Sequence, residues 1–150
     1  MKAVIQRVSS CQVTVGSDTV GSIAGGFLIL LGVESGDTEK DAEKLSAKIS
    51  VLRIFTDADD KMNLSLQDID GEVLVVSNFT LSADCRKGRR PNFIGAEKPE
   101  RANELYEYFC KCMTKNGINK VEKGVFGADM QVSLVNDGPV TIIINSGDLA

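Results

Sequence analysis

The sequence predicts an α+β fold in one domain that spans residues 1–150. Two observations support this prediction: about six segments of strand length are apolar or alternate in polarity, and two longer segments have the periodicity of helices. A third is that no proline- or serine-rich linker, repeat or low-complexity tract interrupts the chain. A chain of this length buries a sizeable core without disulfides or metals, so one continuous domain is expected.

The first part of the chain is predicted to be mostly extended. Residues Ala3–Val15 are expected to form a strand, and the turn residues Gly16–Asp18 follow it. Val20–Ile23 then pairs back as the second arm of a hairpin. The segment Phe27–Val33 is apolar on both faces, which is typical of a strand that is covered on both sides.

The first predicted helix begins near Thr38, whose hydroxyl suits an N-cap position. Val51–Phe55 is expected to run into a short strand after this helix. The turn residues Asp70–Gly71 then introduce Glu72–Ser77, which is predicted to be another buried strand. The inner face of the helix is formed by apolar residues at intervals of three or four: Ala42, Leu45, Ile49 and Leu52.

The second half contains a long polar loop, a second helix and two strands. The loop covers Asp84–Glu97, and Pro99 suits the first turn of the following helix because proline has no N–H to leave unpaired there. Asn116–Gly117 ends this helix. Met130–Val135 and Val140–Ile144 are predicted strands with antiparallel neighbours. The inner face of the second helix consists of Ala102, Leu105, Tyr106, Phe109 and Met113.

Composition excludes several classes of function. The chain contains no histidine, which excludes Ser-His-Asp and Cys-His catalysis, an HExxH zinc site and a histidine-based pH switch. The net charge of −4 argues against wholesale coating of nucleic acid but is compatible with a local basic patch. The N-terminus lacks the apolar run of a signal peptide and no segment is long enough to span a membrane, so a cytoplasmic protein with reduced cysteines is expected.

The first candidate site is Ser77-Asn78-Phe79-Thr80-Leu81, where a predicted buried strand ends in polar residues. Catalytic groups are common where a rigid strand feeds a loop. Ser77 and Thr80 supply hydroxyls, and the backbone N–H groups beyond the strand are suited to stabilise an oxyanion. On local features alone, a strand end with turn-forming polar residues is the favoured interpretation.

The second candidate is the loop Arg86-Lys87-Gly88-Arg89-Arg90-Pro91, which gathers four cations in five residues of an acidic chain. Arginine supplies forked donors for phosphate and lysine a point charge. The alternative is a solvated surface loop. Binding to an anion is the favoured interpretation, because like charges this close repel one another when no anion is present. The nearby Phe93 is suited to stack on a base.

The third candidate is Asn136-Asp137-Gly138-Pro139-Val140-Thr141, which would ordinarily be a hairpin turn. Pro139 is unusual for a two-residue hairpin, because the residue after an Asp-Gly turn normally offers its N–H to the ladder. Bonds that precede proline adopt the cis form at low cost, and a cis bond would expose two successive carbonyls. The local sequence leaves the isomer open.

Three other features are rejected as sites. Asp57–Lys61 has the acidic density of a calcium loop, but Met62 stands where glycine is required and no glutamate closes the frame. Cys110-Lys111-Cys112 has its two thiols in different directions on a helix and no second pair in zinc spacing. Cys85 lies beside cations, but a catalytic cysteine is improbable without a histidine as its base.

These motifs together resemble the D-aminoacyl-tRNA deacylase family. The residues from Ser77 to Phe93 are similar to its first signature, and Asn136–Thr141 resembles its second. The resemblance extends over essentially the whole chain, and two ordered signatures make it specific. Asn78 is a departure, because the family usually has glutamine there and asparagine reaches one methylene less far. Further similar segments are Ile5–Val8, Leu31–Val33, Lys61–Asn63 and Phe126–Met130.

The resemblance implies a barrel-like, mostly antiparallel sheet flanked by two main helices. It also implies a homodimer, without cofactor or metal, that hydrolyses the ester between a D-amino acid, or mischarged glycine, and the 3′-terminal ribose of tRNA. L-aminoacyl-tRNA is expected to be rejected, so that the enzyme proofreads chirality in translation.

The resemblance also assigns roles to residues. Gly138-Pro139 is implied to be a cis pair that enters the pocket of the partner subunit, where its carbonyls read the substrate's α-amino group. Arg7 would help to hold that loop, and Met130 would line the pocket. The catalytic site is implied at Ser77, Asn78, Phe79 and Thr80. Binding of the tRNA is assigned to Arg86, Lys87, Arg89 and Arg90.

Two mechanisms compete without an imidazole. In the first, the Thr80 hydroxyl attacks the ester carbonyl, although no evident base activates it. In the second, which we favour, N–H groups near Phe79 and Thr80 stabilise the oxyanion while the 2′-hydroxyl of the ribose assists, with water. Two rival functions remain: an RNA-binding module without activity, and an esterase or peptidase that acts on small D-amino acid derivatives.

Overall fold

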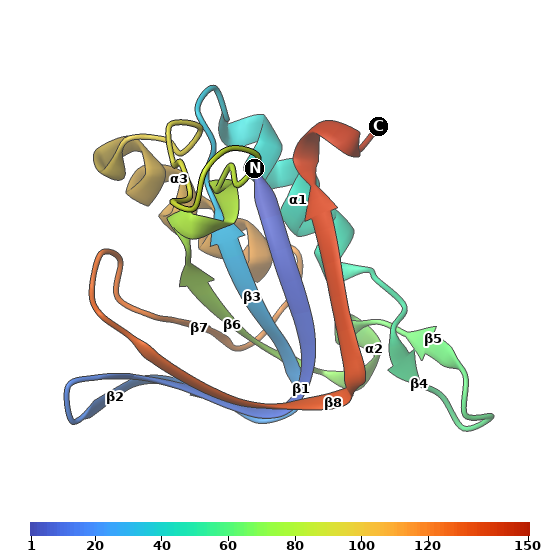
Figure 1. Cartoon of the computed structure of the whole chain (residues 1–150). Coiled ribbons are helices and arrows are strands. Elements are labelled where there is room, and N and C mark those ends of the chain that lie inside the picture. The colour runs from blue at the N-terminus through green and yellow to red at the C-terminus, as the bar shows by residue number, and fades with distance from the viewer.

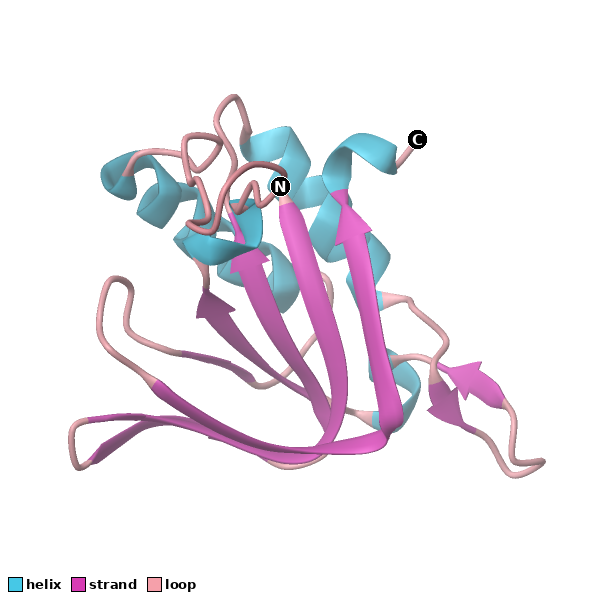
Figure 2. Cartoon of the chain, viewed as in Figure 1, coloured by secondary structure: helices cyan, strands magenta, loops and turns pink.

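A computed structural model describes all 150 residues of the chain and shows a curved, barrel-like mixed sheet with helices against its outer face (Figures 1 and 2). The elements in chain order are β1 (Lys2–Val15), β2 (Asp18–Ile23), β3 (Gly26–Gly32), α1 (Glu39–Ser50), β4 (Phe55–Thr56), β5 (Met62–Leu64), α2 (Leu66–Ile69), β6 (Glu72–Ser77), the 3₁₀ helix η1 (Phe79–Ser82), α3 (Pro99–Lys115), β7 (Val121–Lys123), β8 (Gln131–Asn145) and the 3₁₀ helix η2 (Ser146–Asp148).

The main sheet is organised around the long strand β1. The strands follow the order β2-β1-β3-β6-β7, and β8 pairs with the other edge of β1. β1 is antiparallel to β2, β3 and β8, whereas β3–β6 and β6–β7 are parallel. The predicted α+β class and the barrel-like, mostly antiparallel sheet are therefore confirmed, with a parallel part that the sequence patterns did not reveal.

Curvature brings the two ends of the sheet close together. Gly21 of β2 lies against the backbone of β7, because a Cβ atom built on this glycine would come within 2.6 Å of the Lys123 carbonyl oxygen. β2 and β7 are not hydrogen-bonded neighbours, so the barrel is nearly rather than fully closed.

The core has two parts, one on each side of the sheet. The larger part lies between the sheet and the helices and contains the inner faces of α1 and α3. The smaller part fills the barrel and includes Val8, Cys11 and Leu74. Burial inside the barrel raises the pKa of the Cys11 thiol to about 11, so that it behaves as an apolar side chain at neutral pH.

Most predicted elements are confirmed, with differences at their ends. Thr38 is the N-cap of α1, and its hydroxyl and N–H both donate to the Asp41 carboxylate. The expected strand at Val51–Phe55 is wrong for its first four residues, since β4 contains only Phe55–Thr56. The two predicted C-terminal strands are one continuous strand, β8. Patterns this short also left β5, α2 and β7 unpredicted.

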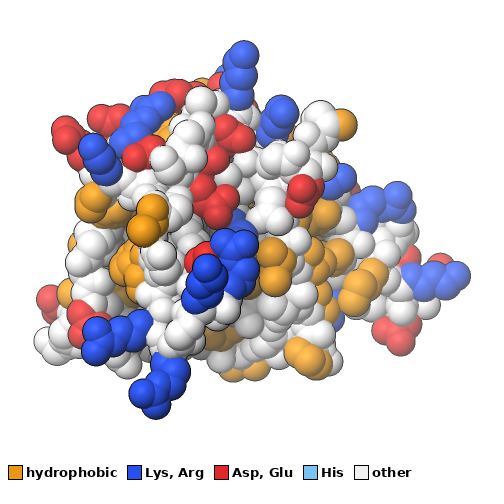
Figure 3. Space-filling model, turned by 45° about the horizontal axis from the view of Figure 1, so that its top comes forward, with side chains coloured by type: hydrophobic (Ala, Val, Ile, Leu, Met, Phe, Trp, Pro, Cys, Tyr) orange, Lys and Arg blue, Asp and Glu red, His pale blue; other side chains and the backbone are white.

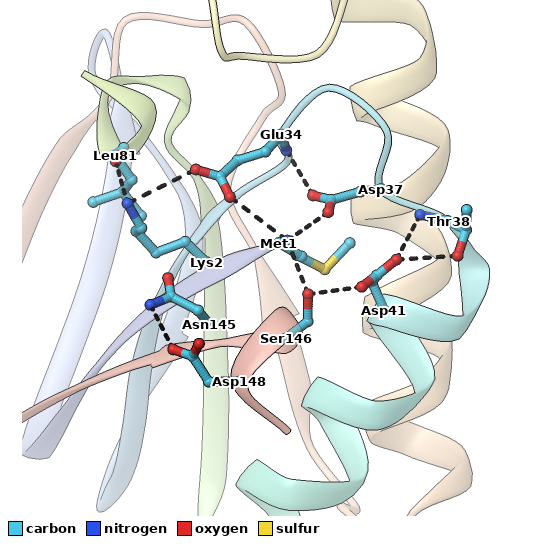
Figure 4. A network of polar contacts seen from close by, with 10 residues as sticks. All are labelled: Met1, Lys2, Glu34, Asp37, Thr38, Asp41, Leu81, Asn145, Ser146 and Asp148. Carbon is cyan, nitrogen blue, oxygen red and sulfur yellow. Dashed lines mark hydrogen bonds and ion pairs between the residues drawn. The ribbon is translucent and has the colours of Figure 1, made fainter. Parts of the chain in front are cut away.

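Met1, just before β1, and Ser146, just after β8, are tied to the start of α1 by a polar network (Figure 4). The Met1 α-ammonium donates to Asp37 Oδ1 at 2.5 Å and to Ser146 Oγ at 2.9 Å, and the Ser146 hydroxyl donates to Asp41 at 2.8 Å. Burial opposes ionisation of Asp41, but hydrogen bonds from Thr38 and Ser146 outweigh it and lower the pKa of this carboxyl. The network holds the start of β1 and the end of β8 against the N-terminus of α1.

No helix of the structure is both long enough and apolar enough to cross a membrane.

Candidate functional site

The segment Ser77–Thr80 lies where two parallel strands end. Leu31 of β3 is in register with Ser77 of β6, and the Asn78 N–H donates to the Leu31 carbonyl at 2.8 Å. η1 begins with the next residue, Phe79. Carboxyl ends of neighbouring parallel strands are a common place for ligand sites, because the chain must leave the sheet there and frees backbone groups.

Side chains of this segment are arranged by local contacts. The Thr80 hydroxyl donates to the Oδ1 atom of the Asn78 amide. Phe79 is 60% exposed and meets Phe93 edge to face, with ring centroids 5.1 Å apart. On the other side of η1, the Lys2 ammonium donates to the Leu81 carbonyl at 3.2 Å, which ties this turn to β1 (Figure 4).

A cavity of about 970 Å³ opens beside this segment. Its wall is mostly apolar and comes from β3, β6, η1, the start of α3, the β7–β8 connection and β8. All four residues expected to be catalytic lie on this wall, and so does Met130. The volume is that of a site for a small molecule or for one end of a larger ligand.

Three charged residues that the sequence patterns did not single out also line the cavity: Glu97, Lys98 and Asp129. Glu97 and Lys98 immediately precede Pro99, where the predicted loop becomes α3. The only sequence feature that marks Glu97 and Lys98 is their position between the long polar loop and the start of the second predicted helix. Each stands on a loop whose path is decided by tertiary packing, so their place on the same cavity wall as Thr80 was not visible in the sequence.

Tyr106 contributes to the cavity wall but is occupied by the scaffold. Its hydroxyl donates to the Val75 carbonyl at 2.7 Å, and burial raises the pKa of this phenol well above its usual range. Tyr106 therefore stays protonated and serves to fix α3 against β6 rather than to move protons.

The loop Gly138–Pro139 lies outside this cavity. Its peptide bond is cis, and both residues are exposed. Arg7, which is buried, donates from Nε to the Asp137 carbonyl at 2.8 Å and from Nη1 to the Ile54 carbonyl at 2.6 Å. Arg7 thus joins the base of the loop to the segment before β4.

The basic loop precedes Phe93 of the cavity wall in the sequence. Arg86 pairs with Asp84, and this pairing raises the pKa of the guanidinium and lowers that of the carboxyl. The remaining cations Lys87, Arg89 and Arg90 are exposed and form no ion pair. Asp84 and Asn92 exchange backbone hydrogen bonds of 2.7 and 2.9 Å, which closes the loop next to Phe93 on the cavity wall.

Figure 3 brings the end of the molecule that carries the helices forward and shows acidic and basic side chains interspersed there, with apolar side chains exposed between them.

The structure groups the expected site residues in three places. Ser77–Thr80 and Met130 share one cavity, the basic loop adjoins that cavity at Phe93, and the exposed Gly138–Pro139 loop lies apart from it with the buried Arg7 at its base.

The chain is similar over its whole length to proteins of known family. A family model described as D-Tyr-tRNA(Tyr) deacylase matches residues 4–145. A D-aminoacyl-tRNA deacylase of Thermus aquaticus is 57% identical over 99% of this chain and 97% of its own. One of Geotalea uraniireducens is 58% identical over 97% of this chain and 94% of its own.

Two solved structures are similar as well. One described as c-Myc DNA Unwinding Element Binding Protein has a TM-score of 0.91 and 41% identity, covering 97% of this chain and 98% of that chain. A probable eukaryotic D-amino acid tRNA deacylase has a TM-score of 0.78 at 17% identity, covering 96% and 98%, which shows the fold alone. From the family match and the relatives that are more than half identical, the chain belongs to the D-Tyr-tRNA(Tyr) deacylase family.

Proposed function

We propose that this chain, as a single domain of residues 1–150, hydrolyses the ester bond between a D-amino acid, or mischarged glycine, and the 3′-terminal ribose of tRNA. We expect it to work in the cytoplasm as a homodimer, and to leave L-aminoacyl-tRNA intact. The observation that carries the proposal is the cavity at the ends of β3 and β6. In this chain, which matches the deacylase family model, Ser77–Thr80 line that cavity. Relatives are named D-aminoacyl-tRNA deacylase.

Stabilisation of the oxyanion is assigned to the start of η1. The first N–H groups of a helical turn have no acceptor within that turn, so those of Phe79 and Thr80 are available to a ligand. Fixed N–H donors in an apolar cavity stabilise a developing negative charge strongly, because little reorganisation is needed when the charge forms.

The geometry of Thr80 supports assistance by the RNA over attack by the threonine. Its hydroxyl donates to the Asn78 amide oxygen, which is not a base that can take the proton. The 2′-hydroxyl beside the ester supplies the second route, in which the enzyme holds the ester in place and water completes hydrolysis. Thr80 then orients the substrate and shapes the oxyanion site.

Chiral selection is assigned to the exposed loop of a second subunit. Gly138 and Pro139 are absent from the wall of their own cavity and are exposed to solvent. If they enter the cavity of a partner, their carbonyls accept hydrogen bonds from the α-ammonium of one hand only. The other hand drives its side chain against main chain. Selection by a backbone clash admits many D-residues, so specificity is chiral rather than chemical.

The tRNA is expected to reach the cavity along the basic loop. Lys87, Arg89 and Arg90 are free to meet phosphates, and the exposed ring of Phe79 with Phe93 offers a surface on which a terminal base can stack.

The proposal is tested by single-turnover assays on paired D-Tyr-tRNA and L-Tyr-tRNA. We expect the D-ester to be cleaved and the L-ester to survive. Equal protection of both esters would instead support a binding module without activity. One of the similar solved structures is also described as a binding protein, for a DNA unwinding element. Equal activity on a free D-tyrosine ester and on D-Tyr-tRNA would support a small-molecule esterase.

A further inference from the structure

The strand β8 leaves its ladder at the Gly138–Pro139 loop. Gln6 of β1 is in register with Thr141, and Val8 with Asn136. One residue of β1, Arg7, therefore stands opposite residues 137–140 of β8. Figure 1 shows that β8 bends sharply between its two halves. Extra residues on one strand lose their ladder hydrogen bonds, so other groups must hold them in place.

The side chain of Asn136 replaces the missing strand neighbour. The Val140 N–H donates to Asn136 Oδ1 at 2.7 Å, and Asn136 Nδ2 donates to the Val140 carbonyl at 3.1 Å. Nδ2 also donates to Thr141 Oγ1 at 3.2 Å. An amide side chain is a donor and an acceptor at once, so it satisfies both backbone groups of one residue as a paired strand would.

Val140 transmits this anchoring to the loop. It is the buried residue at the loop's base, and Gly138 packs directly on it: a Cβ built on Gly138 would come within 2.7 Å of Val140 Cγ2 and 2.9 Å of Val140 N. Gly138 has φ +145°, a conformation that L side chains rarely adopt. Arg7 fixes the other end of the loop through the Asp137 carbonyl. The loop is thus clamped at both ends and exposed in the middle.

We propose that Asn136 is a positioning residue for chiral selection. It fixes Val140, and through Val140 it sets the direction in which the carbonyls of the Gly138–Pro139 loop project. The proposal rests on the proposed deacylase function. Discrimination between two hands depends on the position of those carbonyls to within about half an ångström, so a loosened loop loses selectivity before the fold is lost.

The test compares Asn136→Ala with Asn145→Ala, its control on the same strand, whose side chain bonds only to Asp148. For Asn136→Ala, kcat/KM on D-Tyr-tRNA is expected to fall by about tenfold or more, as for loss of one or two hydrogen bonds. Hydrolysis of L-Tyr-tRNA should rise relative to that of D-Tyr-tRNA. Asn136→Asp keeps the acceptor for the Val140 N–H and should retain more selectivity than Asn136→Ala.

Hydrogen exchange at the Val140 amide provides a second measurement that does not depend on activity. Exchange should become faster in Asn136→Ala and stay slow in Asn145→Ala, while the other amides of β1 and β8 keep their protection. An unchanged D-to-L ratio in Asn136→Ala, or an unchanged Val140 amide, overturns the assignment. If Asn136→Ala does not fold, the same comparison is made with Asn136→Asp. A wild-type protein that cleaves neither ester contradicts the deacylase function, and the exchange data then still decide whether Asn136 clamps the loop.

Discussion

The hydrogen bond of the Thr80 hydroxyl distinguishes between two roles for this residue, that of a nucleophile and that of a residue that orients the substrate. A nucleophile needs a base to take its proton, whereas the Thr80 hydroxyl donates to an amide oxygen of Asn78. The Asn78 side chain turns back onto the threonine two residues later. The pair is therefore organised as a hydrogen-bonded part of the wall.

We predict that Thr80→Ala loses only about tenfold in kcat/KM on D-Tyr-tRNA, the usual effect of one hydrogen bond. A substrate with a 2′-deoxy terminal adenosine should be cleaved slower by a factor on the order of a hundred or more in the wild type, because the assisting hydroxyl is gone. Single-turnover rates measure both, with Thr80→Ser as the matched control. Abolished activity in Thr80→Ala together with rapid cleavage of the deoxy substrate would contradict RNA assistance.

At the scale of elements, the basic loop is built to present charge rather than to neutralise it. Asp84 engages Arg86, and the backbone bridge between Asp84 and Asn92 holds the rest of the loop open to solvent. Cations that remain unpaired on a closed loop are available to phosphates without first breaking an ion pair.

The double variant Arg89→Gln/Arg90→Gln is expected to bind tRNA more weakly. The slope of the logarithm of its tRNA binding constant against the logarithm of the salt concentration should be shallower by about 1 to 2, because fewer counterions are released. The double variant Lys111→Gln/Lys115→Gln on α3 removes the same charge elsewhere and should leave the slope nearly unchanged. Filter binding across a salt series measures this, and equal slopes for both double variants would make the loop an ordinary solvated surface.

At the scale of the whole molecule, Gly138 and Pro139 are absent from the cavity wall of their own chain, although the proposed function needs both the loop and the cavity. A site that needs both is complete only when two chains supply each other, which is the geometry of an isologous pair. In such a pair each subunit would provide one cavity for the substrate and one loop that selects the substrate in the partner's cavity.

This arrangement predicts complementation between two inactive variants. Gly138→Ala/Pro139→Ala damages the loop and leaves the cavity intact, whereas Ala128→Trp fills the cavity and leaves the loop intact. Mixed and re-annealed in equal amounts, they should recover about one quarter of wild-type D-Tyr-tRNA hydrolysis, because half the dimers are mixed and each has one complete site. No recovery in verified mixed dimers would show that the loop serves its own chain.

The sequence by itself determined the α+β class, the long strand β1, the start of α1 and both ends of α3, and it made Ser77–Thr80 a candidate site through the resemblance to a family. These features follow from local periodicity, capping residues and ordered signatures, which are properties of neighbouring residues. The absence of histidine also follows directly from composition and excludes an imidazole as the catalytic base.

Tertiary structure alone decided the parallel pairing of β3 with β6, the continuity of β8 through the Gly138–Pro139 loop, and the placement of Lys98 and Asp129 on the same cavity wall as Thr80. Register between strands depends on contacts far apart in sequence, and no local pattern encodes it. The clamp of Asn136 on Val140 is visible only once β1 and β8 are paired, because it replaces hydrogen bonds that the pairing itself leaves unmade.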